Sequence, residues 1–176
     1  MITILSDHTN QKVGEKLYES LKNKNISTEF ISVADINVGP CYSCGGCTDK
    51  TYGKCINRDD ADMIFSKLVH TDVMVMITPV KWGSYSFKTK RVFDKCAVIG
   101  DRHYYKKNGE LVKGKIGNIN TFVAVGVKAN WLDGEKEVFQ NLVAENIKIM
   151  NIKGRAYVVD NSNWEGCLEA IIEELS

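Results

Sequence analysis

The run DVMVMITPV, at Asp72–Val80, limits the folds open to this chain more than any other feature of the sequence. It is apolar at nearly every position until Pro79, which restricts the residue before it and ends a strand. A strand that is apolar on both sides must be covered on both faces, as the central strands of parallel sheets are. The run therefore predicts a parallel sheet with helices packed on each side.

Four other segments are predicted to be strands, and segments of helical spacing alternate with them. The predicted strands are Met1–Ser6, Ser27–Val33, Asn120–Val127 and Arg155–Asp160. The predicted helices are Asn10–Asn23, a helix opened by Asp59 and Asp60, Ser86–Ile99, Glu135–Met150 and Trp164–Leu175. A polar stretch at 101–118 is expected to be a long exposed excursion. The alternation predicts the α/β class: a three-layer, doubly wound, five-stranded parallel sheet in the flavodoxin-like order 2-1-3-4-5.

Chain length and charge narrow the possible functions. A length of 176 residues suits one domain, 1–176, with a cysteine-rich loop at 40–56. The net charge of +1 gives no electrostatic reason to bind nucleic acid or an anionic membrane. The first ten residues form no basic leader, and no window approaches the ~18–20 apolar residues of a spanning helix. We therefore expect a cytoplasmic protein.

Three loops are candidates for ligand binding, because ligands of such sheets bind beyond the carboxyl ends of the strands. The first loop is rich in hydrogen-bond donors: Ser6, His8, Thr9, Asn10 and Gln11. It leads from a strand into a helix N-terminus, where orphan N–H groups favour an anion such as a phosphate. The alternative is plain helix capping by Thr9 or Asn10. The loop lacks the glycines of a P-loop or a dinucleotide fingerprint, which argues against ATP and a classical NAD site.

The second loop, TPVKWGSYS at 78–86, brings aromatic side chains, a tight glycine turn and hydroxyl groups to the same edge. Trp82, Gly83 and Ser84 would suit a flat heteroaromatic ligand. Alternatively, Trp82 only fills a gap between helix and sheet. The third loop, Gly126–Trp131, starts with a glycine and ends with a second tryptophan, and it could wall the same pocket.

The segment from the cysteines to Lys95 resembles a known family. It contains CYSCGGC, an acidic helix start DDADM, and PVKWGSYS followed by Lys90 and the pair Asp94 and Lys95. In order and spacing these motifs are similar to those of the flavodoxin-like NAD(P)H-dependent FMN reductases and, among them, the iron–sulfur flavoproteins. The resemblance runs through most of the chain. It implies a non-covalent FMN, with NAD(P)H as the electron donor.

Position by position, the resemblance implies roles for two sets of residues. The phosphate cradle would be Ser6, His8, Asn10 and Gln11, and the isoalloxazine border would be Pro79, Val80, Lys81, Trp82, Gly83 and Ser84. Thr9 in the first loop and Gly126 at the start of the third loop are further candidates for cofactor binding, from their places at the edge of the sheet. The first loop departs from the family pattern, being shorter and having His8 where Arg is common. Lys81 stands where Tyr is common. It would either place a cation near the ring, favouring anionic reduced flavin, or extend into solvent.

Four of the six cysteines fall in the stretch CYSCGGCTDKTYGKC, at Cys41, Cys44, Cys47 and Cys55. Cys41, Cys44 and Cys47 are each separated by two residues, which brings three thiolates onto one tight turn. This spacing suits a [4Fe-4S] cluster. Zinc prefers two separated C-x2-C pairs, and disulfides are rare in the cytosol. A structured, metal-free loop is the remaining alternative. Cys96 and Cys167 lie in helical patterns and are expected to be small buried hydrophobes.

Three functions remain open on these grounds. The first is an FMN-dependent NAD(P)H oxidoreductase acting on flavins, quinones or similar acceptors, with no side chain identified as catalytic. The second is an electron carrier with FMN and a [4Fe-4S] cluster that serves redox-protein partners. The third is a zinc-stabilised, non-catalytic flavodoxin-like module. The resemblance also implies a homodimer or homotetramer, in which the excursion His103–Gly117 could contact a neighbouring copy.

Overall fold

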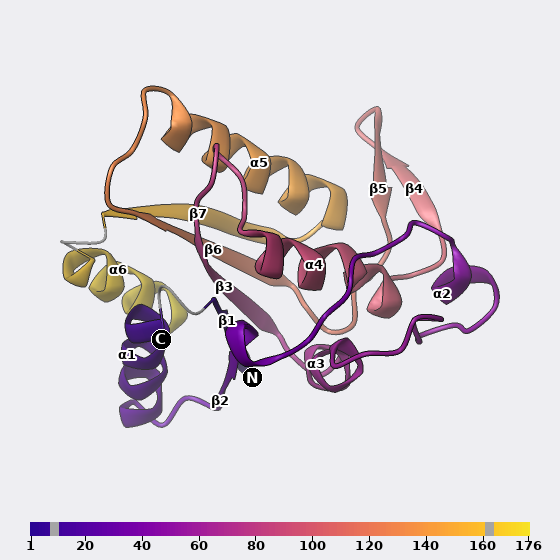
Figure 1. Ribbon diagram of the computed structural model, residues 1–176, viewed down its shortest axis with the longest axis horizontal. Helices are drawn as coiled ribbons and strands as arrows, with labels where there is room; N and C mark the ends of the chain where they lie inside the picture. The colour runs from indigo at the N-terminus through magenta and orange to yellow at the C-terminus, as the bar shows by residue number, and fades with distance from the viewer. Residues whose placement is uncertain (8–10, 161–163) are drawn as a thin grey trace.

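The computed structural model describes residues 1–7, 11–160 and 164–176, and its central element is a five-stranded parallel sheet (Figure 1). The strands lie in the order β2-β1-β3-β6-β7, which is the predicted order 2-1-3-4-5 once the strands of the sheet are counted alone. Their bounds are β1 (Ile2–Ser6), β2 (Thr28–Ser32), β3 (Val73–Pro79), β6 (Thr121–Lys128) and β7 (Lys153–Asp160). The predicted doubly wound α/β fold is confirmed.

Helices cover both faces of the sheet. One face carries α1 (Gln11–Asn23) and α6 (Glu165–Leu175), whose side chains share a core with β1, β3, β6 and β7. The other face carries α3 (Ala61–Leu68), α4 (Phe87–Lys95) and α5 (Glu135–Met150), which form a second core. Strand β3, which forms most of the apolar run Asp72–Val80, lies between the two cores. It pairs with β1 on one side and with β6 on the other. Its lack of polar positions follows from this burial on both faces.

The polar stretch at 101–118, predicted to be a long exposed excursion, contains a β-hairpin. Strands β4 (Tyr104–Lys107) and β5 (Glu110–Lys113) pair antiparallel around Asn108 and Gly109, which both have positive φ. Positive φ at both central residues is the mark of a type I′ turn, and the Asn-Gly dipeptide is its most favoured sequence. Most of the hairpin is exposed as expected, but Val112 and Lys113 are buried.

The remaining elements are short and shape the approach to the cysteines. The helix predicted at Ser86–Ile99 ends at Lys95 and continues as the 3-10 turn η3 (Cys96–Ile99). A one-turn helix, α2 (Gly46–Asp49), lies within the cysteine-rich loop, and the 3-10 turn η2 (Val33–Asp35) precedes that loop. In Figure 1, α2 and the β4–β5 hairpin lie on the same side of the sheet. No helix within the described ranges has the length and apolar character needed to cross a membrane.

Candidate functional site: the carboxyl edge of the sheet and a cysteine cavity

The three predicted ligand loops leave the sheet at one edge. In the strand register, Ser6 of β1 lies opposite Ile77 of β3, and Ile77 lies opposite Val125 of β6. The chain therefore leaves three adjacent strands side by side, at the carboxyl ends where ligands of such sheets bind. The predicted residues His8, Thr9 and Asn10 lie outside the described residues, and Gln11 is the first residue of α1.

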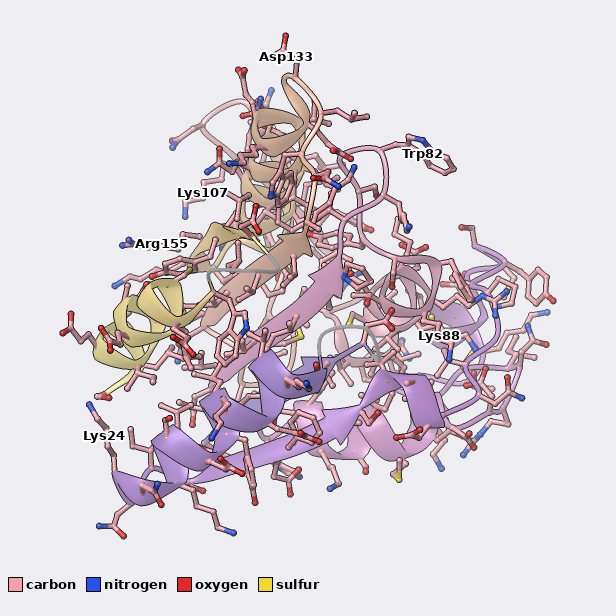
Figure 2. The ribbon with its side chains drawn as sticks, turned by 60° about the vertical axis from the view of Figure 1, so that its left-hand side comes forward. Lys24, Trp82, Lys88, Lys107, Asp133 and Arg155 are labelled. Atoms are coloured by element: carbon pink, nitrogen blue, oxygen red, sulfur yellow. The ribbon has the colours of Figure 1, made fainter. Side chains whose placement is uncertain are left out.

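The second loop is a miniature hairpin with a tryptophan at its tip. Lys81 and Ser84 exchange backbone hydrogen bonds of 3.0 and 2.9 Å, and Trp82 and Gly83 between them have φ of 50° and 73°. A bulky residue rarely adopts the left-handed region, and doing so costs about 1 kcal/mol. Trp82 is 88% exposed, and Figure 2 shows its ring pointing away from the body of the protein. The alternative interpretation, in which Trp82 fills a gap between helix and sheet, is therefore wrong.

A buried carboxylate joins this hairpin to the third loop. Glu135 is 5% exposed, and its Oε1 accepts a hydrogen bond from the backbone N–H of Gly83 at 3.2 Å. Its Oε2 accepts from the backbone N–H of Leu132 at 3.1 Å, and Lys128 Nζ donates to both oxygens at 2.6 and 2.5 Å. The Lys128 hydrogen bond is the main reason that the pKa of Glu135 lies below its ordinary value. Glu135 thus fixes the relative position of two of the three loops.

A second buried link joins the first loop to the second. Ser86 caps the N-terminus of α4, since its Oγ accepts a hydrogen bond from the backbone N–H of Thr89 at 3.2 Å. The same hydroxyl donates to the carboxylate of Asp7, which directly follows β1. Thr78 at the end of β3 accepts a hydrogen bond from the backbone N–H of Ser86 at 3.0 Å. Asp7 is buried, and its carboxylate lies against the Ser86 hydroxyl.

The other residues predicted at this edge differ in accessibility. Ser6 and Val80 are buried, Pro79 and Ser84 are half-buried, and Lys81 is exposed. Gly126 is buried within β6, where a Cβ would come within 2.6 Å of Phe139 and 2.7 Å of Val80. The missing side chain at Gly126 therefore serves the close packing of α5 against the sheet.

The edge offers the chemistry that a flat, polar-rimmed ring system requires. Trp82 presents an exposed aromatic face, and the Lys81–Ser84 turn presents backbone groups. Trp131, in the third loop, has a buried indole Nε1 with no hydrogen-bond partner among the described residues. A buried donor of this kind is normally satisfied. The exposed aromatic face of Trp82 and the tight turn beside it suit a flat ring such as isoalloxazine.

The four clustered cysteines line one cavity of about 260 Å³. Its walls come from the cysteine-rich loop, the end of α4, η3 and the β4–β5 hairpin. Within the described ranges, no three His, Cys, Asp or Glu side chains are arranged to hold a single metal ion. A tetrahedral zinc would require sulfurs within about 4 Å of one another, given Zn–S bonds near 2.3 Å. A [4Fe-4S] cluster takes one thiolate on each iron, so it requires four thiols around one cavity rather than around one ion.

Charged side chains surround the thiols in this cavity. The cavity is lined by the cations Lys95, Arg102 and Lys113. Among the described lining residues, Asp94 is the one carboxylate. Asp94 is already paired with Lys90. The lining is therefore cationic, and a cluster ligated by four thiolates is an anion. The donor set and the charge of the walls both fit an iron–sulfur centre.

An ion pair closes the base of the cysteine-rich loop. Lys95 is fully buried at the end of α4 and is paired with Asp59, which follows the last cysteine. Asp59 also accepts hydrogen bonds from the backbone N–H groups of Gly39 at 2.8 Å and Ala61 at 3.0 Å. Burial alone would raise the pKa of Asp59, but the hydrogen bonds from Lys95, Gly39 and Ala61 lower it on balance. One carboxylate thus holds both ends of the loop against α4.

The two remaining cysteines do not line this cavity. Cys96 is buried in η3, and burial raises the pKa of its thiol to about 12. Cys167 is half-buried in α6, and burial raises its pKa as well. A thiol with a raised pKa is a poor nucleophile and metal ligand. The expectation of small, structural side chains is confirmed in full for Cys96 and in part for Cys167.

The fold and the carboxyl edge define a flavodoxin-like α/β protein, and comparison with known proteins gives the family. The model of the NADPH-dependent FMN reductase family matches residues 5–163. The chain therefore belongs to that family of FMN-dependent oxidoreductases. Among solved structures, an NAD(P)H:quinone oxidoreductase from Methanothermobacter marburgensis superposes with a TM-score of 0.69 at 14% identity, covering 98% of this chain and 93% of its own. At that identity the likeness shows the fold alone.

Curated relatives carry the name iron-sulfur flavoprotein. One from Methanosarcina thermophila is 26% identical over 156 residues, which are 89% of this chain and 73% of the relative. Another, from Methanocaldococcus jannaschii, is 30% identical over 123 residues, which are 70% of this chain and 56% of the relative. The match thus spans between about half and three quarters of the length of these proteins.

Sequence reasoning missed four side chains that organise the two regions. Glu135 and Asp7 tie the edge loops together, and Arg102 and Lys113 join the cysteine cavity from the hairpin. Only Glu135 had a local signature, as an acidic residue in the first turn of its helix. The other three act across long stretches of chain, which spacing does not reveal.

Proposed function

We propose that this protein is an iron–sulfur flavoprotein that transfers electrons between FMN at the carboxyl edge and a [4Fe-4S] cluster held by Cys41, Cys44, Cys47 and Cys55. The observation that carries the proposal is the meeting of these four side chains in one cation-lined cavity. The names of the curated relatives support it. When bound, FMN supplies exchange between one- and two-electron chemistry, and the protein supplies position and electrostatics.

The chain's own residues have defined tasks in this proposal. Glu135 and Lys128 hold the Trp82 hairpin against the third loop, so the edge is preorganised for the ring. Ser86 and Asp7 hold the first loop against α4. No acid, base or nucleophile is assigned, because electron transfer requires none. The two regions are joined by α4, which starts at the edge with its cap Ser86 and ends in the cavity wall at Lys95.

Direct oxidation of NAD(P)H is a second candidate for the way the flavin is reduced. The family's description favours it, and the exposed edge around Trp82 leaves room for a nicotinamide to approach. Hydride would then pass to the flavin, and a small acceptor such as a quinone or a redox protein would take the electrons onward. In this candidate the cysteine cavity is not required for the reaction.

The content of the anaerobically purified protein tests the proposal. FMN, iron and acid-labile sulfide would be measured per chain, together with the visible spectrum. We expect one FMN and about four iron and four sulfide per chain, with broad cluster absorbance under the flavin bands. Stoichiometric FMN without iron, even after reconstitution with ferrous iron and sulfide, would contradict the cluster. NADH and NADPH would then be tested as reductants of the bound flavin.

A further inference from the structure

Lys113 is a buried residue whose ammonium group pairs with no carboxylate among the described residues. It is 8% exposed, at the end of β5, and it lines the cavity of the four cysteines. Its only described polar contact is with the ring of Tyr104, whose centroid lies 4.6 Å from Nζ. Among the described residues, no carboxylate forms an ion pair with it and no acceptor takes a hydrogen bond from it.

The carboxylates near Lys113 are committed elsewhere. Asp59 is paired with Lys95, and Asp94 is paired with Lys90. Asp101, at the start of the hairpin, accepts hydrogen bonds from the backbone N–H and the ring of His103 at 2.9 and 3.2 Å. None of them forms an ion pair with Lys113, so its positive charge is left for something inside the cavity.

The fold directs Lys113 to this place. Gly100 lies against its side chain so closely that a Cβ there would come within 2.4 Å of Lys113 Cε. A backbone bridge between Gly100 and Ile116 holds the base of the hairpin at the same point. The other two cations of the cavity are differently placed. Lys95 is neutralised by Asp59, and Arg102 is exposed and stacks on Tyr52, 4.2 Å from the ring centroid.

The stem of Lys113 is buried, but its ammonium group is not among the buried, unpartnered atoms of the described residues, so it is accessible at the cavity that Lys113 lines. An anion bound in the cavity would therefore meet a cation that no carboxylate neutralises. We propose that Lys113 is the charge partner of the metal–thiolate centre. It favours retention of the anionic cluster and, because one-electron reduction adds a further negative charge, it favours the reduced form. The inference rests on the proposed function, because it requires the cluster. It adds a positioning residue, outside the ligand loop, that sets the reduction potential.

The test compares Lys113→Met, Lys113→Gln and Lys113→Arg with the control Lys106→Met. Lys106 lies on the same hairpin, is exposed and does not line the cavity, so the control removes the same charge elsewhere. Full-length, anaerobically reconstituted protein would be assayed for iron content, for iron release to a chelator, and for the midpoint potential by dithionite titration followed by electron paramagnetic resonance. Urea unfolding of the metal-free proteins gives a readout that does not depend on the cluster.

The neutral variants are expected to lower the midpoint potential and to speed iron release by about tenfold, the effect of one charge-assisted contact. In the metal-free protein the same two variants are expected to unfold at a urea concentration close to that of the wild type, because the ammonium group they remove forms no ion pair or hydrogen bond with the described residues. Lys113→Arg and Lys106→Met should stay close to the wild type. A wild-type protein that binds iron, with neutral variants of unchanged potential and iron release, would overturn the role of Lys113 alone. A wild-type protein that binds no iron would overturn this role and the proposed function together.

Discussion

The carboxyl edge and the cysteine cavity are built in different ways. The edge rests on three hydrogen-bonded parallel strands, and its loops are joined by buried side chains such as Glu135. The cavity contains no strand of the main sheet, and its walls are a loop, the end of α4, a 3-10 turn and a two-stranded hairpin. The edge is therefore a property of the fold, whereas the cavity depends on a few side-chain contacts.

Because the two regions are built differently, we expect that binding of one proposed cofactor can be lost without loss of the other. Loss of the cavity should leave the flavin edge intact, because the strands and both cores remain. The structural connection between them is α4, which has nine residues and is about 13 Å long. The effect of a substitution at one region should therefore be measurable while the other region keeps its cofactor.

The largest expected effect is loss of the cluster from Cys44→Ser. Cys44 lines the cavity, and a serine hydroxyl is a far weaker iron ligand than a thiolate. The variant is expected to lose most of its iron and to retain FMN, as measured by iron assay and the flavin spectrum. The control is Cys167→Ser in α6, which should keep both. Loss of FMN together with iron would show that the two regions are not independent.

Asp59→Asn should be the most destabilising single change at the cavity. It removes the partner of the fully buried Lys95 and weakens the closure of the loop at Gly39. Breaking a buried ion pair costs about 3 kcal/mol, measurable by urea unfolding of the metal-free protein. Asp49→Asn, at an exposed position of the same loop, is the control and should change stability little. Equal stability of the two variants would mean that the ion pair does not hold the loop.

The stabilisation by Asp59 should decrease at low pH. Because the pKa of Asp59 is lowered in the folded protein, its contribution is fully present above the ordinary carboxyl range. It is lost as the pH falls through the lowered pKa. The difference in unfolding free energy between the wild type and Asp59→Asn is expected to be constant above about pH 5 and to shrink below about pH 4. A difference that grows on acidification would contradict this assignment.

At the flavin edge, Glu135→Gln should weaken FMN binding without affecting iron. The amide loses the charge interaction with Lys128 and can satisfy fewer of the donors around it. The dissociation constant of FMN is expected to rise about tenfold, as measured by the recovery of flavin fluorescence on release. Glu137→Gln, two residues on and exposed, is the matched control. An iron content that falls with Glu135→Gln would break the separation between the two regions.

The smallest effect is expected from Trp82→Asn. Asparagine tolerates the left-handed conformation better than tryptophan, and the exposed ring contributes little burial. Unfolding stability should rise by up to about 1 kcal/mol, while FMN affinity falls several-fold through loss of an aromatic contact. Tyr105→Asn, an exposed aromatic residue of the hairpin, should leave FMN affinity unchanged. An unchanged FMN affinity in Trp82→Asn would mean that the indole of Trp82 does not contact FMN.

The sheet could be predicted from the sequence because its evidence is local. The apolar run ending at Pro79 and the alternation of strand and helix patterns led to the observed strand order. The hairpin was missed although Asn108 and Gly109 are a strong turn signal, because the flanking segments are polar and show no apolar alternation. Polar hairpins have little periodicity to reveal them.

The site was predictable only in its parts. The cysteine spacing and the PVKWGSYS motif identified the candidate residues, since their chemistry lies in adjacent positions. The side chains that organise them act over long separations, as with Gly83 and Glu135, which are 52 positions apart in the sequence. Lys113 could not be singled out among the many lysines of the chain, because its burial follows from the hairpin's position over the cysteine-rich loop.

The number of electrons that the protein accepts tests most directly whether one chain holds two redox centres. Anaerobic protein with bound FMN would be titrated with dithionite and followed by absorbance. Two electrons fill the flavin and one fills the cluster, so we predict about three electron equivalents per chain. Cys44→Ser should then accept about two. A wild-type protein that is fully reduced by about two electron equivalents would contradict the account and leave a flavin-only oxidoreductase.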